Sequence, residues 1–289
     1  MKLSVNLRGR NRSVELHVED SEATIFQIKE QLAVKLNLSI VRQRLTYQNT
    51  PLLDDKRTLK AYSIPDKAVL TLKDVGPQIS WKTVFYIEYL GPMAIHQLAM
   101  LLKTNFVRDK YLSTTQLLGY IAVTLHFLKR EYETAFVHRF SHATMPLANL
   151  AKNCAHYWLL SGLLVAYELY FFSRATSTAF TWVWFLAFLG MELGNFKCHV
   201  MLRDLRPKGT NERAIPRGFL FDLVSCPNYL CESGAWLAFA LMTRCWSSWV
   251  FFIVGTVQMY LWAEKKHRAY KKEFDDYPTN RKAMFPFIL

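Results

Sequence analysis

Six long apolar runs between residues 81 and 262 limit what this 289-residue chain can fold into. A helix that crosses a bilayer needs about 20 mainly apolar residues, and a soluble core in a chain of this size does not need so many runs of that length. The runs are Trp81–Leu102, Ser113–Leu128, Cys154–Phe172, Thr178–Gly194, Phe219–Met242 and Trp246–Trp262. They predict a multi-pass α-helical membrane bundle of about six transmembrane helices, embedded in a lipid bilayer.

The charged residues between the runs predict how the bundle is oriented. The net charge of the chain is +13, and three basic segments hold 17 of its Lys and Arg residues: 129–153, 195–217 and 263–289. The three segments that alternate with them hold 5. Because Lys and Arg concentrate on the cytosolic side of membrane proteins, we expect both termini in the cytosol. The basic residues are split among helix ends and form no single stripe, which argues against a nucleic-acid partner.

Residues 1–75 have the pattern of a small soluble α+β domain. Thr24 and Gln27 fit a capping box, and a helix with apolar residues on one face is expected from Ile25 onward. Short strands are expected on both sides of this helix, at Leu3–Leu7, Val14–Val18, Arg44–Tyr47 and Val69–Leu72. This order of strands and helix predicts a β-grasp.

Two motifs in this domain, Q-R-L-T-Y at Gln43–Tyr47 and D-D-K-R-T-L-K-A-Y-S-I at Asp54–Ile64, resemble ubiquitin. The chain continues beyond the domain, so no free diglycine tail is expected there for conjugation. The strand surface that ubiquitin receptors grip is polar here, with Thr46, Thr71 and Lys73. We therefore expect the ubiquitin-like domain, residues 1–75, to act as a folded cap or stability module before a transmembrane domain at 76–289.

Polar and basic residues gather between the fourth and fifth apolar runs. Asn195, His199 and Arg203 are spaced i, i+4 and i+8, so on a helix they share one face, with Arg206 adjoining. Arginine forks bind phosphate, and a neutral His or an Asn can hydrogen-bond a ribose or a carboxamide. A solvated helix end at the cytosolic surface fits the same spacing, so the spacing alone leaves both interpretations open.

Two further residues are candidates for chemistry because of where they lie. Prolines at Pro207-Lys208-Gly209, Pro216 and Pro227 predict irregular backbone near the membrane, which usually lines a cavity. Tyr229 follows the last of these and is either a weak acid in that cavity or an aromatic anchor at the interface. Glu88 lies inside the first apolar run, where a carboxylate is costly and usually faces a cavity or a partner.

The remaining candidate groups predict less. Histidines cluster in F-V-H-R-F-S-H at Phe136–His142, but no clean metal-ligand spacing accompanies them, and no metal site is predicted. The five cysteines include no C-x-x-C pair and are expected to act as small core side chains. The basic tail at Lys265–Pro278 is helical in pattern, and fits either a membrane-surface helix or a phosphate clamp.

Four C-terminal motifs occur in an order that resembles the steroid 5-alpha-reductase family. They are R-D-L-R-P-K-G at Arg203–Gly209, I-P-R-G at Ile215–Gly218, N-Y-L-C-E at Asn228–Glu232, and K-H-R-A-Y with F-D-D-Y-P between Lys266 and Pro278. Phe136–His142, S-C-P-N-Y at Ser225–Tyr229 and the ubiquitin-like domain are similar to one branch of that family. This branch is the very-long-chain trans-2-enoyl-CoA reductases of the endoplasmic reticulum.

The resemblance implies a reaction and a set of site residues. NADPH would deliver hydride to the β-carbon of a long-chain trans-2-enoyl-CoA, in the last step of fatty-acid elongation, which also feeds sphingolipid synthesis. Other elongation enzymes are the implied protein partners. Tyr229 and Glu88 are the implied catalytic residues. The cofactor residues expected on these motifs are Asn195, His199, Arg203, Arg206, Asn228, His267, Arg268 and Tyr270.

Other functions remain possible on the sequence. Where the steroid-reducing branch has His-Tyr, this chain has His126-Phe127, which argues against the reduction of a steroid or polyprenol. A non-catalytic membrane adaptor would leave Asn228, Tyr229 and the basic tail unexplained. A methyltransferase on a related fold is a weaker alternative. Within the reductase interpretation, Tyr229 donates to the enolate oxygen, and Glu88 either orients it or protonates the α-carbon.

Overall fold

The computed structural model describes residues 1–9, 12–107, 111–140, 143–173, 176–206 and 214–288. It divides into two compact units. The first is Met1–Ser80 with His142–Asn149, and the second is Trp81–Ser141 with Leu150–Leu289. The expected helix break at Pro207-Lys208-Gly209 and the residue His142 of the histidine cluster lie outside the described residues.

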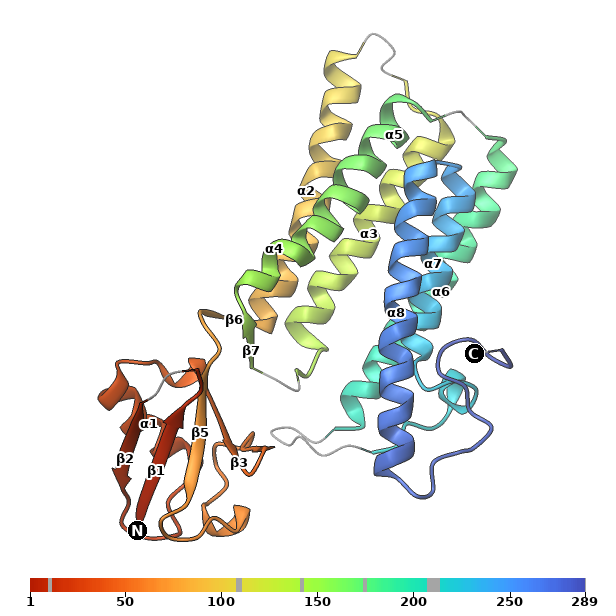
Figure 1. Ribbon diagram of the computed structural model, residues 1–289. Coiled ribbons are helices and arrows are strands. Elements are labelled where there is room, and N and C mark those ends of the chain that lie inside the picture. Colours follow the sequence, from red (N-terminus) through yellow and green to blue (C-terminus); the bar gives the residue numbers. More distant parts are fainter. Residues whose placement is uncertain (10–11, 108–110, 141–142, 174–175, 207–213, 289) are drawn as a thin grey trace. The chain divides into compact units, whose positions relative to one another are not determined.

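The first unit contains the predicted β-grasp, in which α1 (Ile25–Leu36) crosses one face of a five-stranded sheet (Figure 1). The strand order is β2-β1-β5-β3-β4, with β1 and β5 parallel and the other pairs antiparallel. The strands are β1 (Lys2–Leu7), β2 (Ser13–His17), β3 (Gln43–Tyr47), β4 (Thr50–Pro51) and β5 (Val69–Asp74). A separate two-stranded sheet pairs β6 (Gln78–Ser80) with β7 (Thr144–Pro146).

Local sequence signals explain why α1 forms where it does. The Thr24 hydroxyl accepts a hydrogen bond from the Gln27 amide at 3.3 Å, and the Gln27 side chain accepts one from the Thr24 amide at 2.8 Å, so the predicted capping box is confirmed. The helix ends at Asn37, whose left-handed backbone places its amide on the Ala33 carbonyl. Its apolar face is buried against the alternating apolar residues of the sheet, which gives this unit a core of its own.

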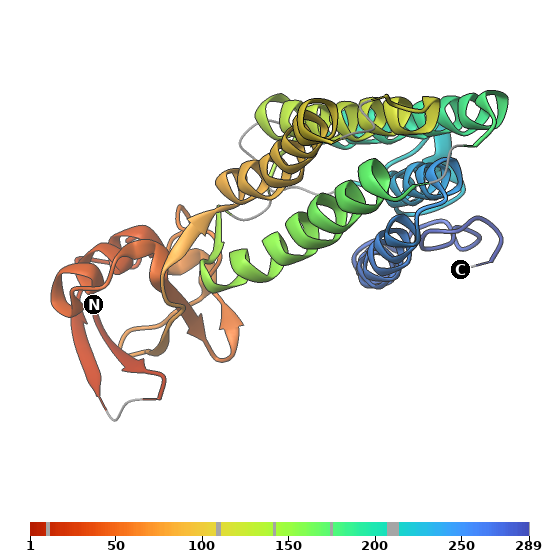
Figure 2. The same cartoon turned by 90° about the horizontal axis from the view of Figure 1, so that it is seen from above.

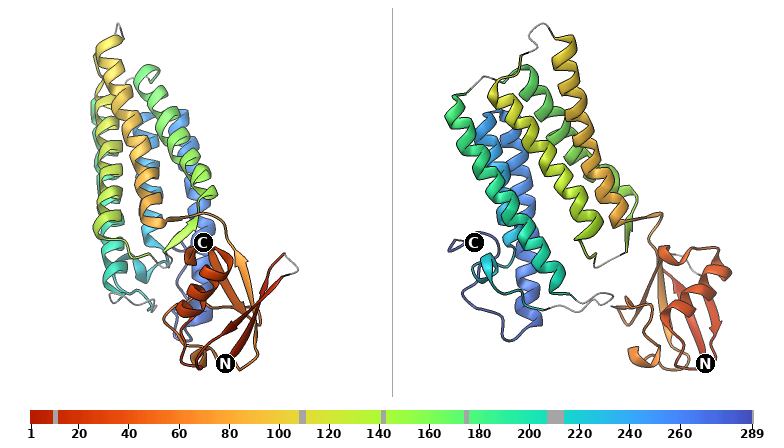
Figure 3. Two further views of the ribbon diagram at one scale, coloured as in Figure 1. Left: turned by 90° about the vertical axis from the view of Figure 1, so that its left-hand side faces the viewer. Right: turned by 180° about the vertical axis from the view of Figure 1, so that it is seen from behind.

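The second unit is a bundle of long helices that run side by side (Figures 1 and 3). Its helices are α2 (Trp81–Phe106), α3 (Thr114–Phe136), α6 (Thr178–Asp204), α7 (Pro227–Thr243) and α8 (Trp246–Glu273). One further helical stretch is continuous from α4 (Ala148–Cys154) through the π-helical segment η3 (Ala155–Leu164) to α5 (Val165–Phe171). Seen from above, α3 and α6 lie on one side of the bundle, and α5 and α8 on the other (Figure 2).

A helix covers each of the six predicted apolar runs, although some boundaries differ from those expected. The second run was expected to end at Leu128, but α3 continues to Phe136 because its polar end packs inside the unit. The fifth run does not begin a helix at Phe219, where residues Phe219–Asp222 form one 3₁₀ turn, and α7 begins at Pro227. Proline at the first helical position is favoured because it has no N–H to leave unpaired. In the basic tail, α8 continues unbroken to Glu273, so no separate surface helix forms there.

The outer surface of the bundle is apolar, as a bilayer requires. Large apolar side chains such as Leu98, Val183, Leu193, Val257 and Leu261 are more than half exposed. By length and composition, α6 is the helix in the described part of the chain that is long and apolar enough to cross a membrane. The bundle core is aromatic, and is centred on Phe127, Phe188, Trp236 and Phe239.

Candidate functional site

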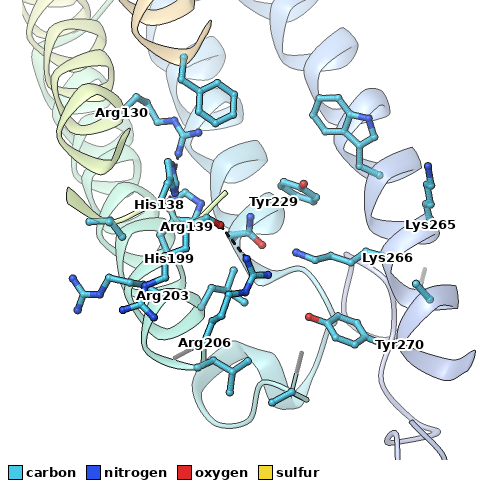
Figure 4. Close-up of a pocket in the computed structure, with 18 residues that line it drawn as sticks. Arg130, His138, Arg139, His199, Arg203, Arg206, Tyr229, Lys265, Lys266 and Tyr270 are labelled. Carbon is cyan, nitrogen blue, oxygen red and sulfur yellow. Dashed lines mark hydrogen bonds between the residues drawn. The ribbon is translucent and has the colours of Figure 1, made fainter. Parts of the chain in front are cut away.

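A cavity of about 540 Å³ opens among the ends of α3, α6, α7 and α8 (Figure 4). This is a size typical of ligand pockets, which range over roughly 300–1,000 Å³. Its polar lining residues are Arg130, His138, Arg139, His199, Arg203, Arg206, Asn228, Tyr229, Lys265, Lys266 and Tyr270. All of these belong to the second unit, so the cavity is defined within one compact body.

The cavity is strongly cationic. Four arginines and two lysines line it, and the described lining residues include no Asp or Glu. Two of the arginines have acidic partners outside the lining, since Arg130 pairs with Glu133 at 2.7 Å and Arg203 with Asp204 at 2.8 Å. Figure 4 shows Arg130, Arg203 and Arg206 on one wall, with Lys266 reaching in from α8 opposite. Like charges so close together repel, so this arrangement favours an anionic ligand with several charged groups, and arginine forks favour phosphate.

Tyr229 and Asn228 enter this cavity from the first turn of α7. The Tyr229 ring faces the cavity (Figure 4), and its hydroxyl makes no hydrogen bond to any described residue. Asn228 is buried, and its Oδ1 atom has no hydrogen-bond partner among the described residues. Leaving a buried acceptor without a donor costs free energy of folding. A ligand N–H group that donates to Asn228 Oδ1 would remove that cost.

The C-terminal tail holds the start of α7 in place. The Ser225 amide donates to the Lys282 carbonyl at 2.8 Å, and the Cys226 amide donates to the Ala283 carbonyl at 3.1 Å. These strand-like bonds fix the segment immediately before Pro227. The position of Tyr229 therefore depends on residues more than 50 positions later in the chain.

The end of α6 brings the predicted His199 and Arg203 to the cavity, with Arg206 just beyond. His199 Nδ1 lies 2.9 Å from Glu133 Oε1, and Arg206 donates to the Arg139 carbonyl at 3.2 Å. Asn195, one turn before His199, does not line the cavity. Its Nδ2 donates to the Asn228 carbonyl at 2.8 Å, so it supports the cavity wall from behind.

The predicted residues of the tail are divided between the cavity and its surroundings. Tyr270 lines the cavity and stacks on Tyr277, with ring centroids 5.5 Å apart. His267 is turned away, and its Nδ1 lies 2.6 Å from the Ser225 hydroxyl. Arg268 is exposed and pairs with Glu264 at 2.8 Å. His267 therefore helps to hold the segment before α7, and Arg268 lies outside the lining.

Glu88 is buried in α2 and does not line the cavity. Its Oε1 atom has no hydrogen-bond partner in the described part of the chain, and Asn153 is within hydrogen-bonding range of the carboxyl group. The adjacent Tyr89 hydroxyl accepts a hydrogen bond of 2.7 Å from Arg130, which does line the cavity. Glu88 therefore lies outside the cavity, next to the tyrosine that binds Arg130 of the lining.

Sequence reasoning did not assign Arg130, Glu133 and His138, at and just beyond the end of α3, to the site, although it noted the histidine cluster at Phe136–His142. Arg130 pairs with Glu133 at 2.7 Å, an i, i+3 spacing that is visible in the sequence but common on solvated helices. Burial, together with the charge of Arg130, lowers the pKa of His138 to about 2, so this imidazole is neutral at physiological pH. It adds no positive charge to the cavity.

The same group has the geometry of a metal site, because ligand atoms of Glu133, His138 and His199 lie within 4.8 Å of one another. However, Arg130 already occupies Glu133 Oε2, and Lys129 lies 4.0 Å from Oε1. Two cations at the carboxylate disfavour a third. Internal ion pairing therefore accounts for this cluster.

A second buried ion network joins α3, α6 and α7 behind the cavity. Glu192 binds His126 Nδ1 at 2.8 Å and Lys129 at 2.6 Å, and Lys129 also donates to Asn195 Oδ1 at 2.5 Å. His126 Nε2 lies 3.5 Å from Glu232. Separating these helices would leave buried charges without partners, which is costly. The network therefore fixes the positions of α3, α6 and α7 relative to one another.

Comparisons with known proteins agree with this architecture. The family described as 3-oxo-5-alpha-steroid 4-dehydrogenase matches residues 143–289, and the ubiquitin family matches residues 3–73. A very-long-chain enoyl-CoA reductase of Dictyostelium discoideum is 39% identical over 93% of each chain. A Schizosaccharomyces pombe protein named as a candidate enoyl reductase is 44% identical over the full length of both chains.

A trans-2,3-enoyl-CoA reductase-like protein of Bos taurus is 34% identical over 83% of this chain and 69% of its own. These matches extend across both units of the structure, and are too long and too similar to reflect the ubiquitin-like domain alone. The chain therefore belongs to the very-long-chain enoyl-CoA reductase family, with a 3-oxo-5-alpha-steroid 4-dehydrogenase domain behind a ubiquitin-family domain.

Proposed function

We propose that this protein reduces very-long-chain trans-2-enoyl-CoA to the saturated acyl-CoA, with NADPH as the hydride donor. The observation that carries the proposal is the cationic cavity with Tyr229 in its wall, in a chain whose relatives are named for this reaction. The reaction is the last step of a fatty-acid elongation cycle and also feeds sphingolipid synthesis.

The lining residues fit NADPH on two grounds. Its pyrophosphate and ribose phosphate match the arginines and lysines, with Arg203, Arg206 and Lys266 as the side chains we assign to them. The unpaired Asn228 Oδ1 matches the N–H of the nicotinamide carboxamide. Asn195 and His267 support this site from behind, through Asn228 and Ser225.

When bound, NADPH supplies the hydride that is added to the β-carbon of the substrate. The addition leaves negative charge on the thioester oxygen, which needs a hydrogen-bond donor in a site shielded from water. We assign this role to the Tyr229 hydroxyl, which is not engaged by any described residue. One such preorganised donor is typically worth about 10²–10³ in rate. Glu88 is buried with one oxygen unpaired, but it lies outside the cavity lining, so a role in protonating the α-carbon requires the substrate to reach past Arg130.

We also propose where the protein works. Membership of this reductase family supports a multi-pass protein of the endoplasmic reticulum membrane, and the basic segments of the chain favour both termini in the cytosol. The CoA phosphates would then meet the cationic mouth from the cytosol, while the acyl chain runs between helices whose surfaces are apolar. Other fatty-acid elongation enzymes are the proposed partners, since they make the substrate in the same membrane.

The test is NADPH oxidation by the purified full chain in detergent. A long-chain trans-2-enoyl-CoA should be reduced, whereas the saturated acyl-CoA of equal length should give no oxidation. A 3-oxo-4-ene steroid serves as the competing acceptor. Its reduction should be slow, because the steroid-reducing branch has a tyrosine where this chain has Phe127, a buried core side chain without a hydroxyl. Oxidation with the steroid and none with the enoyl-CoA would refute the proposal.

A further inference from the structure

The open face of the five-stranded sheet carries three neighbouring cations, Arg8, Arg44 and Lys73, which we call the cationic row. Arg44 and Lys73 are register partners on β3 and β5, so their side chains are adjacent on one face. Their inward neighbours Leu45 and Leu72 are buried, which places the two cations on the face opposite α1. Arg8 follows β1 directly, and its amide donates to the Leu72 carbonyl at 2.9 Å. The strands β1, β5 and β3 that carry the row lie side by side (Figure 1).

The row is not neutralised within the domain. All three side chains are exposed, and none forms an ion pair with any described residue. The acid next to Lys73 in the chain, Asp74, pairs with Arg42 at 2.6 Å. Like charges opposite each other on neighbouring strands destabilise a sheet. The row is therefore explained best by an anion outside the domain.

The row lies at the end of the sheet from which the chain leaves. Because β1 and β5 are parallel and β3 is antiparallel to them, the last residues of β1 and β5 and the first of β3 share this end. Residues 74–80 join Lys73 to Trp81, where α2 begins, and a stretch of that length reaches at most about 29 Å. A linker this short keeps the domain close to the membrane that holds α2, so the effective concentration of lipid headgroups at the row is high.

We propose that the cationic row of the ubiquitin-like domain binds anionic lipid headgroups at the surface of the bilayer that holds the helical unit. The residues beside the row, Thr46 and Thr71, are polar and half-buried, so they offer hydrogen-bond donors. The exposed apolar side chain of the same strand, Val69, lies at the opposite end of β5 from the row. The row therefore fits contact with headgroups and not insertion. An acidic protein segment has the same sign of charge, but only the bilayer is brought close by the chain itself. This function is separate from the reductase reaction.

The test uses the full chain in nanodiscs of phosphatidylcholine alone or with phosphatidylserine. A fluorophore is placed on the open face through Asn6→Cys, with Cys154→Ser, because the other four cysteines are buried. Quenching by headgroup-labelled lipid reports contact. We expect quenching in the discs that contain phosphatidylserine, and its loss at high salt. Replacing Arg8, Arg44 and Lys73 by Gln should weaken the docked state about a hundredfold.

The matched control replaces Lys2, Lys56 and Lys67 by Gln. This removes the same charge from exposed sites of the same domain, away from the row, and quenching should persist. Nanodiscs expose both leaflets, so the result does not depend on orientation. Equal quenching in both lipid mixtures, or an equal loss in the control, would overturn the proposal. A row variant that keeps lipid quenching would also overturn it and leave an acidic protein as the occupant. NADPH oxidation, measured on the same samples, separates this outcome from failure of the proposed reaction.

Discussion

Tyr229 owes its position to bonds that the sequence does not reveal. The residues before α7 are held by the backbone of Lys282 and Ala283 and by the contact between Ser225 and His267. From the sequence, Tyr229 taken by itself favoured an interfacial anchor, because the pairing with the tail is set by tertiary structure. His267 was expected at the cofactor, whereas its ring is engaged with Ser225. A support role for His267 follows from that contact.

At the residue scale, we predict that Lys266→Gln weakens NADPH binding about tenfold, the value of one charge-assisted hydrogen bond. Lys266 reaches into the cavity from α8, so its ammonium group is available to a phosphate (Figure 4). Lys271→Gln is the matched control, because Lys271 is an exposed cation on the same helix and does not line the cavity. Calorimetric titration with NADPH measures both variants. Equal affinity for the two variants would count against the assigned phosphate contact.

At the scale of elements, the sequence predicted more of the fold than of the site. The capping box at Thr24 and the alternation in β1 and β2 are local signals, and both led to elements that the structure contains. The pocket is assembled from four helices, so its composition depends on packing that a linear pattern does not encode. Arg130 lines it and Glu88 does not, although Glu88 stood out more clearly in the sequence. Whether Glu88 acts in catalysis stays a prediction.

Packing between α2 and η3 gives an element-scale prediction. A Cβ atom on Gly91 would lie 1.9 Å from Trp158 Nε1, and that indole donates to the Ile87 carbonyl at 3.0 Å. Gly91→Ala should therefore displace Trp158 and destabilise the protein by roughly 1–3 kcal/mol. In Gly255→Ala, the new methyl group meets nothing within 4 Å, so the change should be neutral or stabilising by up to about 1 kcal/mol. Thermal unfolding in detergent compares them, and equal midpoints would contradict the close packing.

At the scale of the whole molecule, charge and hydropathy separate the chain into a soluble domain and a membrane bundle. The positive charge of the chain is concentrated in the three basic segments 129–153, 195–217 and 263–289, which include the ends of α3, α6 and α8. All three segments contribute residues to the cationic cavity, so the charge that predicts orientation also forms the site. The same basic residues therefore indicate cytosolic loops and a phosphate site, and the sequence alone could not separate these two interpretations.

The proposed orientation predicts that both termini are accessible from the cytosol. In sealed microsomes, tags at the N- and C-termini should both be removed by added protease, without detergent. A tag on the segment between α3 and α4, which is also basic, should be accessible as well. Protection of either terminus would contradict the six-span topology.

The measurement that tests the central claim most directly is single-turnover reduction of a long-chain trans-2-enoyl-CoA by Tyr229→Phe, alongside NADPH titration of the same variant. If the Tyr229 hydroxyl stabilises charge on the thioester oxygen, the rate should fall about 10²–10³-fold while the Kd for NADPH stays near that of the unmodified protein. An unchanged rate would contradict the account and move the donor to another group, with Glu88 the first to be tested.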